Sequence, residues 1–363
     1  MCIICTGKYH GKTTIDCSNC PDLRKIPMIS GLRKLNCSYC KSLKEIPVIP
    51  GLEYLDCSDC ENLTSIPSIH DLKILNCSLT NVTEIPIIFG LKILYCSECP
   101  NLTDISIIPG LEELWCCDCT ALIKINSIPS LKNLHCGQCL NLAEIPITPG
   151  LKELYCYGCP NLTEIPDIPG LKELYCWECV NLTKISIIPG LEKLNCRDCK
   201  NLTNVPVIPD LIELSCGRCP NLEEIPVIHG LKELDCYSCS KLTNIPIIPG
   251  LQKLYCCDCA NLTEIPDIPG LQEIDCRNCR SLTKIPNVFL IICEGSPWLE
   301  HNPEFKENLA NLVKIQRYVK KYHKLKICKR WVQSNDFRQW YYHPEGPGGI
   351  KAVLRLVKKT KMN

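Results

Sequence analysis

A twenty-residue pattern repeats from near the start of the chain to about residue 290. Its unit reads L-x-x-L-x-C-x-x-C-x-x-L-x-x-I-P-x-I-P-G, and we number its positions 1 to 20 from the first leucine. Fourteen copies follow one another with a single one-residue deletion between Cys77 and Cys96. A unit this short cannot bury its own apolar side chains. Neighbouring copies must therefore stack into a solenoid that shares one continuous core.

Two kinds of local structure are expected within each unit. Leucine at positions 1 and 4 and cysteine at position 6 alternate as the inward residues of a short strand do. Proline at position 16, and usually at 19, fixes φ and removes a backbone donor, which excludes a regular helix on the return path. The return arm is therefore predicted to be extended or polyproline-like. Glycine at position 20, as at Gly51 and Gly110, allows the turn into the next strand.

The frame I-P-x-I-P-G-L-x-x-L-x-C-x-x-C resembles the leucine-rich repeat family over about residues 11–293. It is similar to the short twenty-residue class of bacterial effector proteins, with cysteine where that class has an aliphatic residue at position 6 and asparagine at position 9. Cysteine at position 9 is also similar to the cysteine-containing subclass, and more loosely to repeat proteins of giant DNA viruses. The resemblance implies a repeat solenoid with a parallel β-sheet on one face. It implies little about the ligand.

Three regions are expected: an N-terminal cap at 1–10, the solenoid at 11–293, and a basic, partly helical C-terminal region at 294–363. The segment Cys2 to Cys5 is predicted to supply a capping strand, and residues 288–293 a fifteenth, atypical strand. From residue 304 to about 332, apolar residues at three- and four-residue intervals predict an amphipathic helix. That helix is interpreted as a cap over the last repeats, packing through Leu309, Leu312, Val319 and Tyr322.

The net charge of +1 hides a strong asymmetry. Residues 300–363 carry a formal charge of +10, and the first 299 residues carry −9. The basic tail could bind nucleic acid or an acidic surface. The negative charge of the solenoid disfavours binding of nucleic acid along its length.

The sequence also bears on the compartment. It shows no secretory signal and no run of about eighteen apolar residues, so we expect an intracellular, cytoplasmic protein without a membrane span. In that setting the 33 cysteines would be reduced. The Asn-Leu-Thr triplets, as at Asn62 and Asn161, would be polar loop residues rather than glycosylation sites.

The cysteine pairs allow more than one interpretation. Successive pairs read C-x2-C-x16-C-x2-C, which matches a four-thiolate zinc site. In a solenoid, however, equal positions stack about 4.8 Å apart, so the cysteines would form two buried columns. One copy is interpreted as carrying Leu79 in place of the second cysteine, and leucine cannot ligate a metal. We favour structural thiols that donate to backbone carbonyls, with metal binding or redox chemistry as the alternatives. Cys117 and Cys257, at outward-facing position 7, are expected to be the more reactive thiols, although nothing nearby marks either as activated.

Catalysis has little support in the sequence. There is no P-loop, dinucleotide fingerprint or H-E-x-x-H motif, and the carboxylates scatter over the repeats. Cys328 has no plausible partner nearby, and the 65-odd residues after the repeats are too few for a ligase domain such as similar effectors carry. We therefore expect no enzyme activity, no small-molecule substrate and no cofactor.

Aromatic residues concentrate in the middle repeats at outward strand positions. Five consecutive copies carry a ring at position 5, and two of these also carry one at position 7. The residues are Tyr95, Trp115, His135, Tyr155, Tyr157, Tyr175 and Trp177. His135, alone among titratable neighbours, is interpreted as a surface residue. A charged rim is expected from Glu113, Lys152, Glu153, Lys172 and Glu173.

Tyrosine and tryptophan dominate interface hot spots, so this patch predicts a protein partner on the strand (concave) face. The leading interpretation is a non-enzymatic protein–protein interaction scaffold. One alternative is a substrate adaptor that docks into a larger complex through the tail; another is a metal-binding or thiol redox protein. Stacked aromatic residues that only stabilise neighbouring strands remain the competing explanation for the patch.

Overall fold

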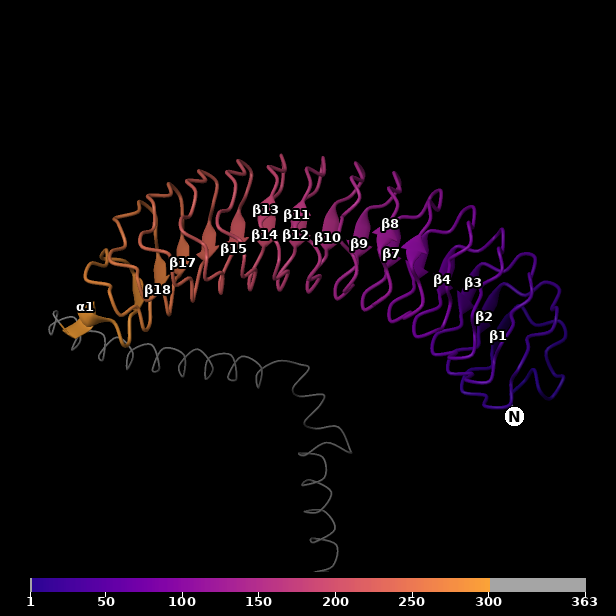
Figure 1. Cartoon of the computed structure of the whole chain (residues 1–363). Coiled ribbons are helices and arrows are strands. Elements are labelled where there is room, and N and C mark those ends of the chain that lie inside the picture. The colour runs from indigo at the N-terminus through magenta and orange to yellow at the C-terminus, as the bar shows by residue number, and fades with distance from the viewer. Residues whose placement is uncertain (1, 301–363) are drawn as a thin grey trace, which may run out of the picture. The chain divides into compact units, whose positions relative to one another are not determined.

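A computed structural model describes residues 2–300 of the chain, and it is built around one parallel sheet of fifteen short strands. Each coil contributes one strand, and the coils follow one another along an arc (Figure 1). In spatial order the strands are β1 (Thr14–Asp16), β2 (Lys34–Asn36), β3 (Tyr54–Asp56), β4 (Ile74–Asn76), β5 (Ile93–Tyr95), β7 (Glu113–Trp115), β9 (Asn133–His135), β10 (Glu153–Tyr155), β12 (Glu173–Tyr175), β14 (Lys193–Asn195), β15 (Glu213–Ser215), β16 (Glu233–Asp235), β17 (Lys253–Tyr255), β18 (Glu273–Asp275) and β19 (Leu290–Ile292).

Strand pairing follows the sequence repeat. Residues at the same position of successive copies are paired, as Leu154 is with Leu174. The one-residue deletion falls at position 10, between Thr80 and Asn81, and the register resumes at once. Asn81 takes position 11 of its coil and donates its side-chain amide to the Glu61 carbonyl at 2.7 Å. Each repeat position therefore forms a column of like side chains along the solenoid.

The core is made by the seven apolar positions of each unit. Leucines at positions 1, 4 and 12, cysteines at 6 and 9, and isoleucines at 15 and 18 face inward and are almost fully buried. In the third coil, side chains exposed by 6 % or less are Leu52, Leu55, Cys57, Cys60, Leu63, Ile66 and Ile69. The predicted repeat solenoid, with its core shared between coils, is confirmed.

Two turns in each coil have sequence explanations. Ile49, Pro50, Gly51 and Leu52 make a turn in which the Leu52 N–H donates to the Ile49 carbonyl at 3.2 Å. Gly51 has a φ of 81°, as the third residue of a type II turn requires. Position 8 is also left-handed in all fourteen copies, although only Gly158 is a glycine there; Asp59 has a φ of 55°. Aspartate and asparagine tolerate this conformation better than most residues, and they are common at position 8.

The return arms are extended, as predicted, and no helix occurs in residues 12–293. Proline at position 16 removes the N–H that could pair with the preceding coil. Where Asn126 and Ser186 replace that proline, their N–H groups donate to the carbonyls of Ile105 and Ile165 at 3.0 and 2.9 Å. These bonds accompany two small parallel sheets, β6 (Asp104–Ile105) with β8 (Lys124–Ile125) and β11 (Glu164–Ile165) with β13 (Lys184–Ile185).

The N-terminal end differs from the prediction. Residues 2–5 do not form a capping strand, because their carbonyls are used locally: the Thr6 N–H donates to Cys2 and the Lys8 N–H to Ile3, both at 3.1 Å. The chain turns on itself there, and Gly7 adopts a φ of 69°. The first strand is β1.

The fifteenth strand is confirmed as β19, which pairs with β18. It is followed by the short helix α1 (Pro297–Glu300). The predicted amphipathic helix at 304–332, its capping role, Cys328 and most of the basic tail lie outside the described residues.

Candidate functional site

The structure brings the seven predicted aromatic residues together on the strand face, and we call them the aromatic stripe. All seven side chains are half-buried. Four of them, on β7, β9, β10 and β12, form a continuous stack. Ring centroids are 3.5 Å apart for Trp115 and His135, 4.3 Å for His135 and Tyr155, and 4.4 Å for Tyr155 and Tyr175. Successive ring planes differ by 11° or less, so the rings lie face to face, somewhat closer together than the strand spacing of about 4.8 Å.

A shorter second column runs beside this stack. Tyr157 and Trp177, at position 7, stack with centroids 4.4 Å apart and planes within 1°. The edge contact between Tyr175 and Trp177, at 6.2 Å and 83°, joins the two columns. Tyr95 closes the other end at 6.0 Å from Trp115, with its ring tilted by 37°. The stripe is therefore one connected surface across five coils.

A glycine makes room for the second column. A Cβ atom added to Gly137 would lie 2.4 Å from the Tyr157 ring, closer than side chains tolerate. The same pairing recurs where a Cβ on Gly217 would lie 2.2 Å from Tyr237. Sequence reasoning did not identify Gly137 as part of the site. The available signal was that glycine at position 7 stands one repeat before a tyrosine at position 7 in both cases.

At position 5, aspartate and asparagine make a hydrogen bond to the backbone that the aromatic residues do not make. Wherever aspartate or asparagine occupies it, the side-chain oxygen accepts the N–H of position 7 in the same coil, closing the turn after the strand. In Asp56, for example, Oδ1 accepts from the Ser58 N–H at 3.0 Å. The residues that make this bond are Asp16, Asn36, Asp56, Asn76, Asn195, Asp235 and Asp275. Within residues 2–300, none of the aromatic side chains at position 5 makes this bond.

His135, interpreted from the sequence as a surface residue, lies half-buried within the stripe. It is stacked between Trp115 and Tyr155. Burial lowers the pKa of His135 to about 4, because the charged imidazolium would lose hydration there. The side chain is therefore neutral at pH 7. Beside it, the indole N–H of Trp115 is buried and has no hydrogen-bond partner within residues 2–300.

The charged rim is partly engaged with the stripe. The Tyr175 hydroxyl donates to Glu173 at 2.8 Å, and Lys193 lies 3.2 Å from the same carboxylate. Burial, together with this bond to an anion, raises the pKa of Tyr175. Lys172 reaches Glu192 at 2.7 Å. Lys152 instead donates to the Gly170 carbonyl at 3.3 Å.

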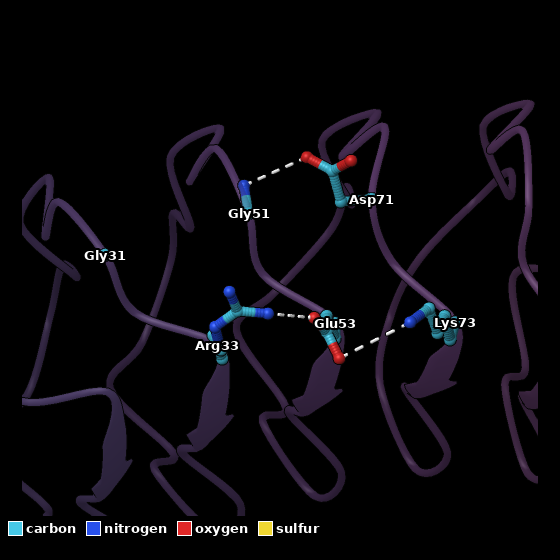
Figure 2. Close-up of a pocket in the computed structure, with 6 residues that line it drawn as sticks. All are labelled: Gly31, Arg33, Gly51, Glu53, Asp71 and Lys73. Atoms are coloured by element: carbon cyan, nitrogen blue, oxygen red, sulfur yellow. Dashed lines mark hydrogen bonds and ion pairs between the residues drawn. The ribbon is translucent and has the colours of Figure 1, made fainter.

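Charged side chains at position 2 form ladders of their own. In Figure 2, Glu53 lies between Arg33 and Lys73, at 2.5 and 3.5 Å, on the rim of a shallow pocket. Farther along, Glu112 is held in the same way by Lys132 and Lys92, which lowers the pKa of that carboxyl to about 2. Such exposed pairs add little stability and align the coils at most weakly.

The cysteines at positions 6 and 9 form the two buried columns that were predicted. The position-9 thiol donates to the position-6 carbonyl of the preceding coil: Cys40 donates to Cys17 at 3.2 Å, and Cys279 to Cys256 at 3.0 Å. Twelve coils share this bond, from Cys40, Cys60, Cys99, Cys119, Cys139, Cys159, Cys179, Cys199, Cys219, Cys239, Cys259 and Cys279. The thiols thus satisfy buried carbonyls between coils.

The assignment of Leu79 to position 9 was wrong. Leu79 occupies the left-handed position 8, with a φ of 58° and 40 % exposure. Thr80 fills position 9 at 1 % exposure and donates its hydroxyl to the Cys77 carbonyl at 2.6 Å. In the last coil Ser296 takes the place of the thiol and donates to the Cys276 carbonyl at 2.7 Å. Position 9 is therefore filled by a small side chain with a polar hydrogen in these coils too, although Thr80 bonds a carbonyl of its own coil and Ser296 one of the preceding coil.

Two further expectations about polar positions need revision. Cys117 and Cys257 are half-buried, and burial raises the pKa of both thiols, to about 11 for Cys257. Neither is therefore activated for reaction.

The asparagines at position 11 are more than loop residues: Asn62 and Asn181 donate to carbonyls of the preceding coil at 2.6 and 2.8 Å.

Comparison with known proteins supports the fold. No model of a known protein family matches the chain, and no curated protein does. Among solved structures, a leucine-rich repeat protein from Bacteroides ovatus is similar, with 19 % identity and a TM-score of 0.51. The similarity covers 78 % of this chain and 80 % of that one. Within the described residues no helix is long and apolar enough to cross a membrane. The chain thus has a leucine-rich-repeat-like solenoid fold.

Proposed function

We propose that this chain is a non-enzymatic interaction scaffold whose protein partner binds the aromatic stripe. The observation that carries the proposal is the exchange at position 5. In most other coils, aspartate or asparagine at position 5 closes the turn after the strand by a hydrogen bond. In five consecutive coils a ring stands at this position instead, and all five rings meet on one face. A solenoid offers such a face as an extended binding surface.

The stacking determines how a partner would be recognised. The faces of the inner rings cover one another, so a partner would meet ring edges, the tyrosine hydroxyls and the outer faces of the end rings. Tyrosine and tryptophan bury large areas at low entropic cost, and both are enriched in hot spots. The rim of glutamates and lysines would surround the contact with charges of both signs.

Affinity capture from a lysate of the source cells tests this proposal. The full chain and a Trp115→Ala, Tyr155→Ala, Trp177→Ala variant would serve as baits. Tyr255→Ala is the matched control, since Tyr255 occupies position 5 but lies outside the stripe. We expect one protein to be recovered by the wild-type chain and the control and lost with the triple variant. Equal recovery by the three baits would reject the stripe as the binding surface.

The adaptor alternative rests on the charge asymmetry, because a tail of +10 could dock into a second partner while the stripe binds the first. Truncation at residue 302 separates this from a capping role. Loss of one captured protein at an unchanged melting temperature supports an adaptor. A lower melting temperature with aggregation supports a cap for the last coil.

The metal or redox alternative is disfavoured for the columns. Their position-9 thiols already donate to carbonyls, and a metal ligand would have to give up that proton. Thr80 and Ser296 take the same place without a sulfur atom.

A further inference from the structure

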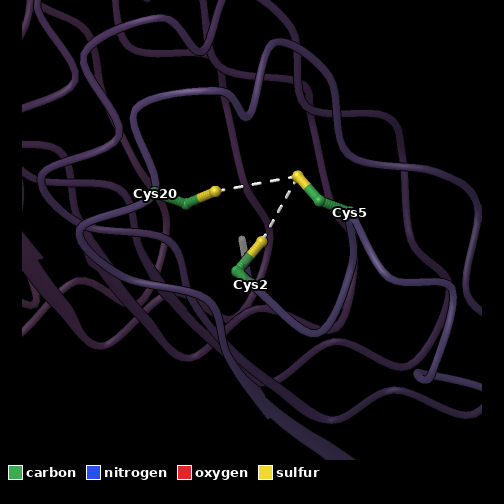
Figure 3. Close-up of side chains that lie close together, drawn as sticks. All are labelled: Cys2, Cys5 and Cys20. Atoms are coloured by element: carbon green, nitrogen blue, oxygen red, sulfur yellow. Dashed lines mark hydrogen bonds between the residues drawn. The ribbon is translucent and has the colours of Figure 1, made fainter.

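Three cysteines converge at the N-terminal end of the solenoid, outside the regular columns. The Sγ atoms of Cys2 and Cys5 lie 3.6 Å apart, and those of Cys5 and Cys20 also lie 3.6 Å apart. All three sulfur atoms are within 4.8 Å of one another. Figure 3 shows the three side chains pointing toward a common centre, two from the N-terminal turn and one from the first coil.

Cys20 differs from the other position-9 cysteines in its surroundings. It is the first member of its column, and within residues 2–300 no preceding coil presents a position-6 carbonyl to its thiol. Cys5 supplies the contact instead. The next cysteine in the column, Cys40, already makes the regular bond, to Cys17. The thiol of Cys17, in turn, donates to the Asn36 carbonyl at 3.3 Å and belongs to the regular structure.

We propose that Cys2, Cys5 and Cys20 bind one thiophilic d10 metal ion, Zn(II) or Cu(I), which ties the N-terminal turn to the first coil. Tetrahedral zinc with Zn–S bonds of about 2.3 Å places its sulfur ligands about 3.8 Å apart. Two of the observed separations, at 3.6 Å, are close to that value and the third is within 4.8 Å, so the ion could enter with small side-chain movements. Thiolate ligands select Zn(II) and Cu(I) among the common metals.

The burial of the three residues suits an accessible site with an open position. Cys20 is buried, Cys2 is half-buried and Cys5 is exposed. An ion could therefore enter from solvent, and water would complete a tetrahedral zinc site, whereas Cu(I) would need only the three sulfur atoms. Each thiol releases its proton to the buffer as its sulfur binds the metal. The bound ion would cover the open end of the solenoid core, which a repeat protein has to protect.

Metal titration of the full chain tests the proposal. Protein reduced and stripped with a chelator would be titrated anaerobically with Zn(II), and separately with Cu(I), each against a chromophoric competitor. We expect one ion per chain in at least one titration, and the two titrations distinguish the metals. That ion should raise the thermal midpoint, because ligands that bind only the folded state stabilise it.

Variants identify the ligands. Cys5→Ser and Cys2→Ser should fold normally, judged by circular dichroism, and should lose both the ion and the thermal shift. Cys257→Ser is the control, since its half-buried thiol lies outside the cluster and should leave binding unchanged. Absence of stoichiometric binding in the wild type would overturn the proposal. So would equal binding by the three variants.

Discussion

At the scale of single residues, each repeat position occupies the same environment in many coils, so exceptions are informative. Position 9 accepts cysteine, threonine or serine. The cysteines and Ser296 donate to the position-6 carbonyl of the preceding coil, whereas Thr80 donates to that of its own coil. What the column requires is a small side chain with a polar hydrogen. The burial of this column was predictable from the period. The identity of its exception was not, because a one-residue deletion hides which residue follows the strand.

Cys139 tests the donor role. Cys139→Ala leaves the Cys116 carbonyl without its donor, and an unsatisfied buried carbonyl costs about 1–3 kcal/mol. Cys139→Ser keeps a donor, as Ser296 does, and should cost less. Urea denaturation compares the two variants. If the alanine variant were as stable as the serine variant, the hydrogen bond would have no structural importance.

His135 should make stability depend on pH. Its folded pKa of about 4 lies below the unfolded value of about 6.5, so the unfolded chain binds the proton more readily between them. The stabilising contribution of the neutral His135 side chain is therefore complete above about pH 6.5 and is lost as the pH falls toward 4. Melting temperatures between pH 7.5 and 4.5 should fall less in His135→Phe than in the wild type. Equal slopes would show that the ring is not desolvated.

At the scale of elements, a strand, two turns and an extended arm recur, and the sequence predicted most of them. Proline at position 16 accounts for the arms, and Asn126 shows what happens where it is missing. The conformation at residues 2–5 was not predictable, because these residues lie before the first repeat and nothing repeats there. The cysteine cluster depends on that turn, so the sequence pattern alone did not reveal it.

Gly137 tests how the second aromatic column fits onto the strands. Gly137→Ala places a methyl group in the Tyr157 ring, and such overpacking costs about 1–3 kcal/mol. Gly217→Ala is matched, since it meets Tyr237 at the same position outside the stripe. Both variants should melt earlier, but only Gly137→Ala should weaken partner binding. Equal binding by the two variants would mean that the second column does not contact the partner.

At the scale of the whole molecule, the repeat supplies stability that is spread evenly along the solenoid, whereas the rings concentrate in its middle. The sequence predicted which residues would share a face, since the period fixes the columns. It did not predict that the rings would stack face to face, because ring orientation depends on neighbours such as Gly137 and on the strand spacing. Stacking of this kind also stabilises neighbouring strands. To distinguish a binding surface from a structural stack, stability and partner affinity must be measured separately on the same variants.

That measurement is the affinity of the captured partner for Trp115→Ala, Tyr155→Ala and Trp177→Ala, with the melting temperature of each variant and Tyr255→Ala as control. If the stripe is the binding surface, at least one of the three substitutions should cost about 2 kcal/mol or more of binding free energy. The melting temperatures should change little, and the control should bind normally. Normal binding with early melting would contradict the account and make the stripe a structural stack.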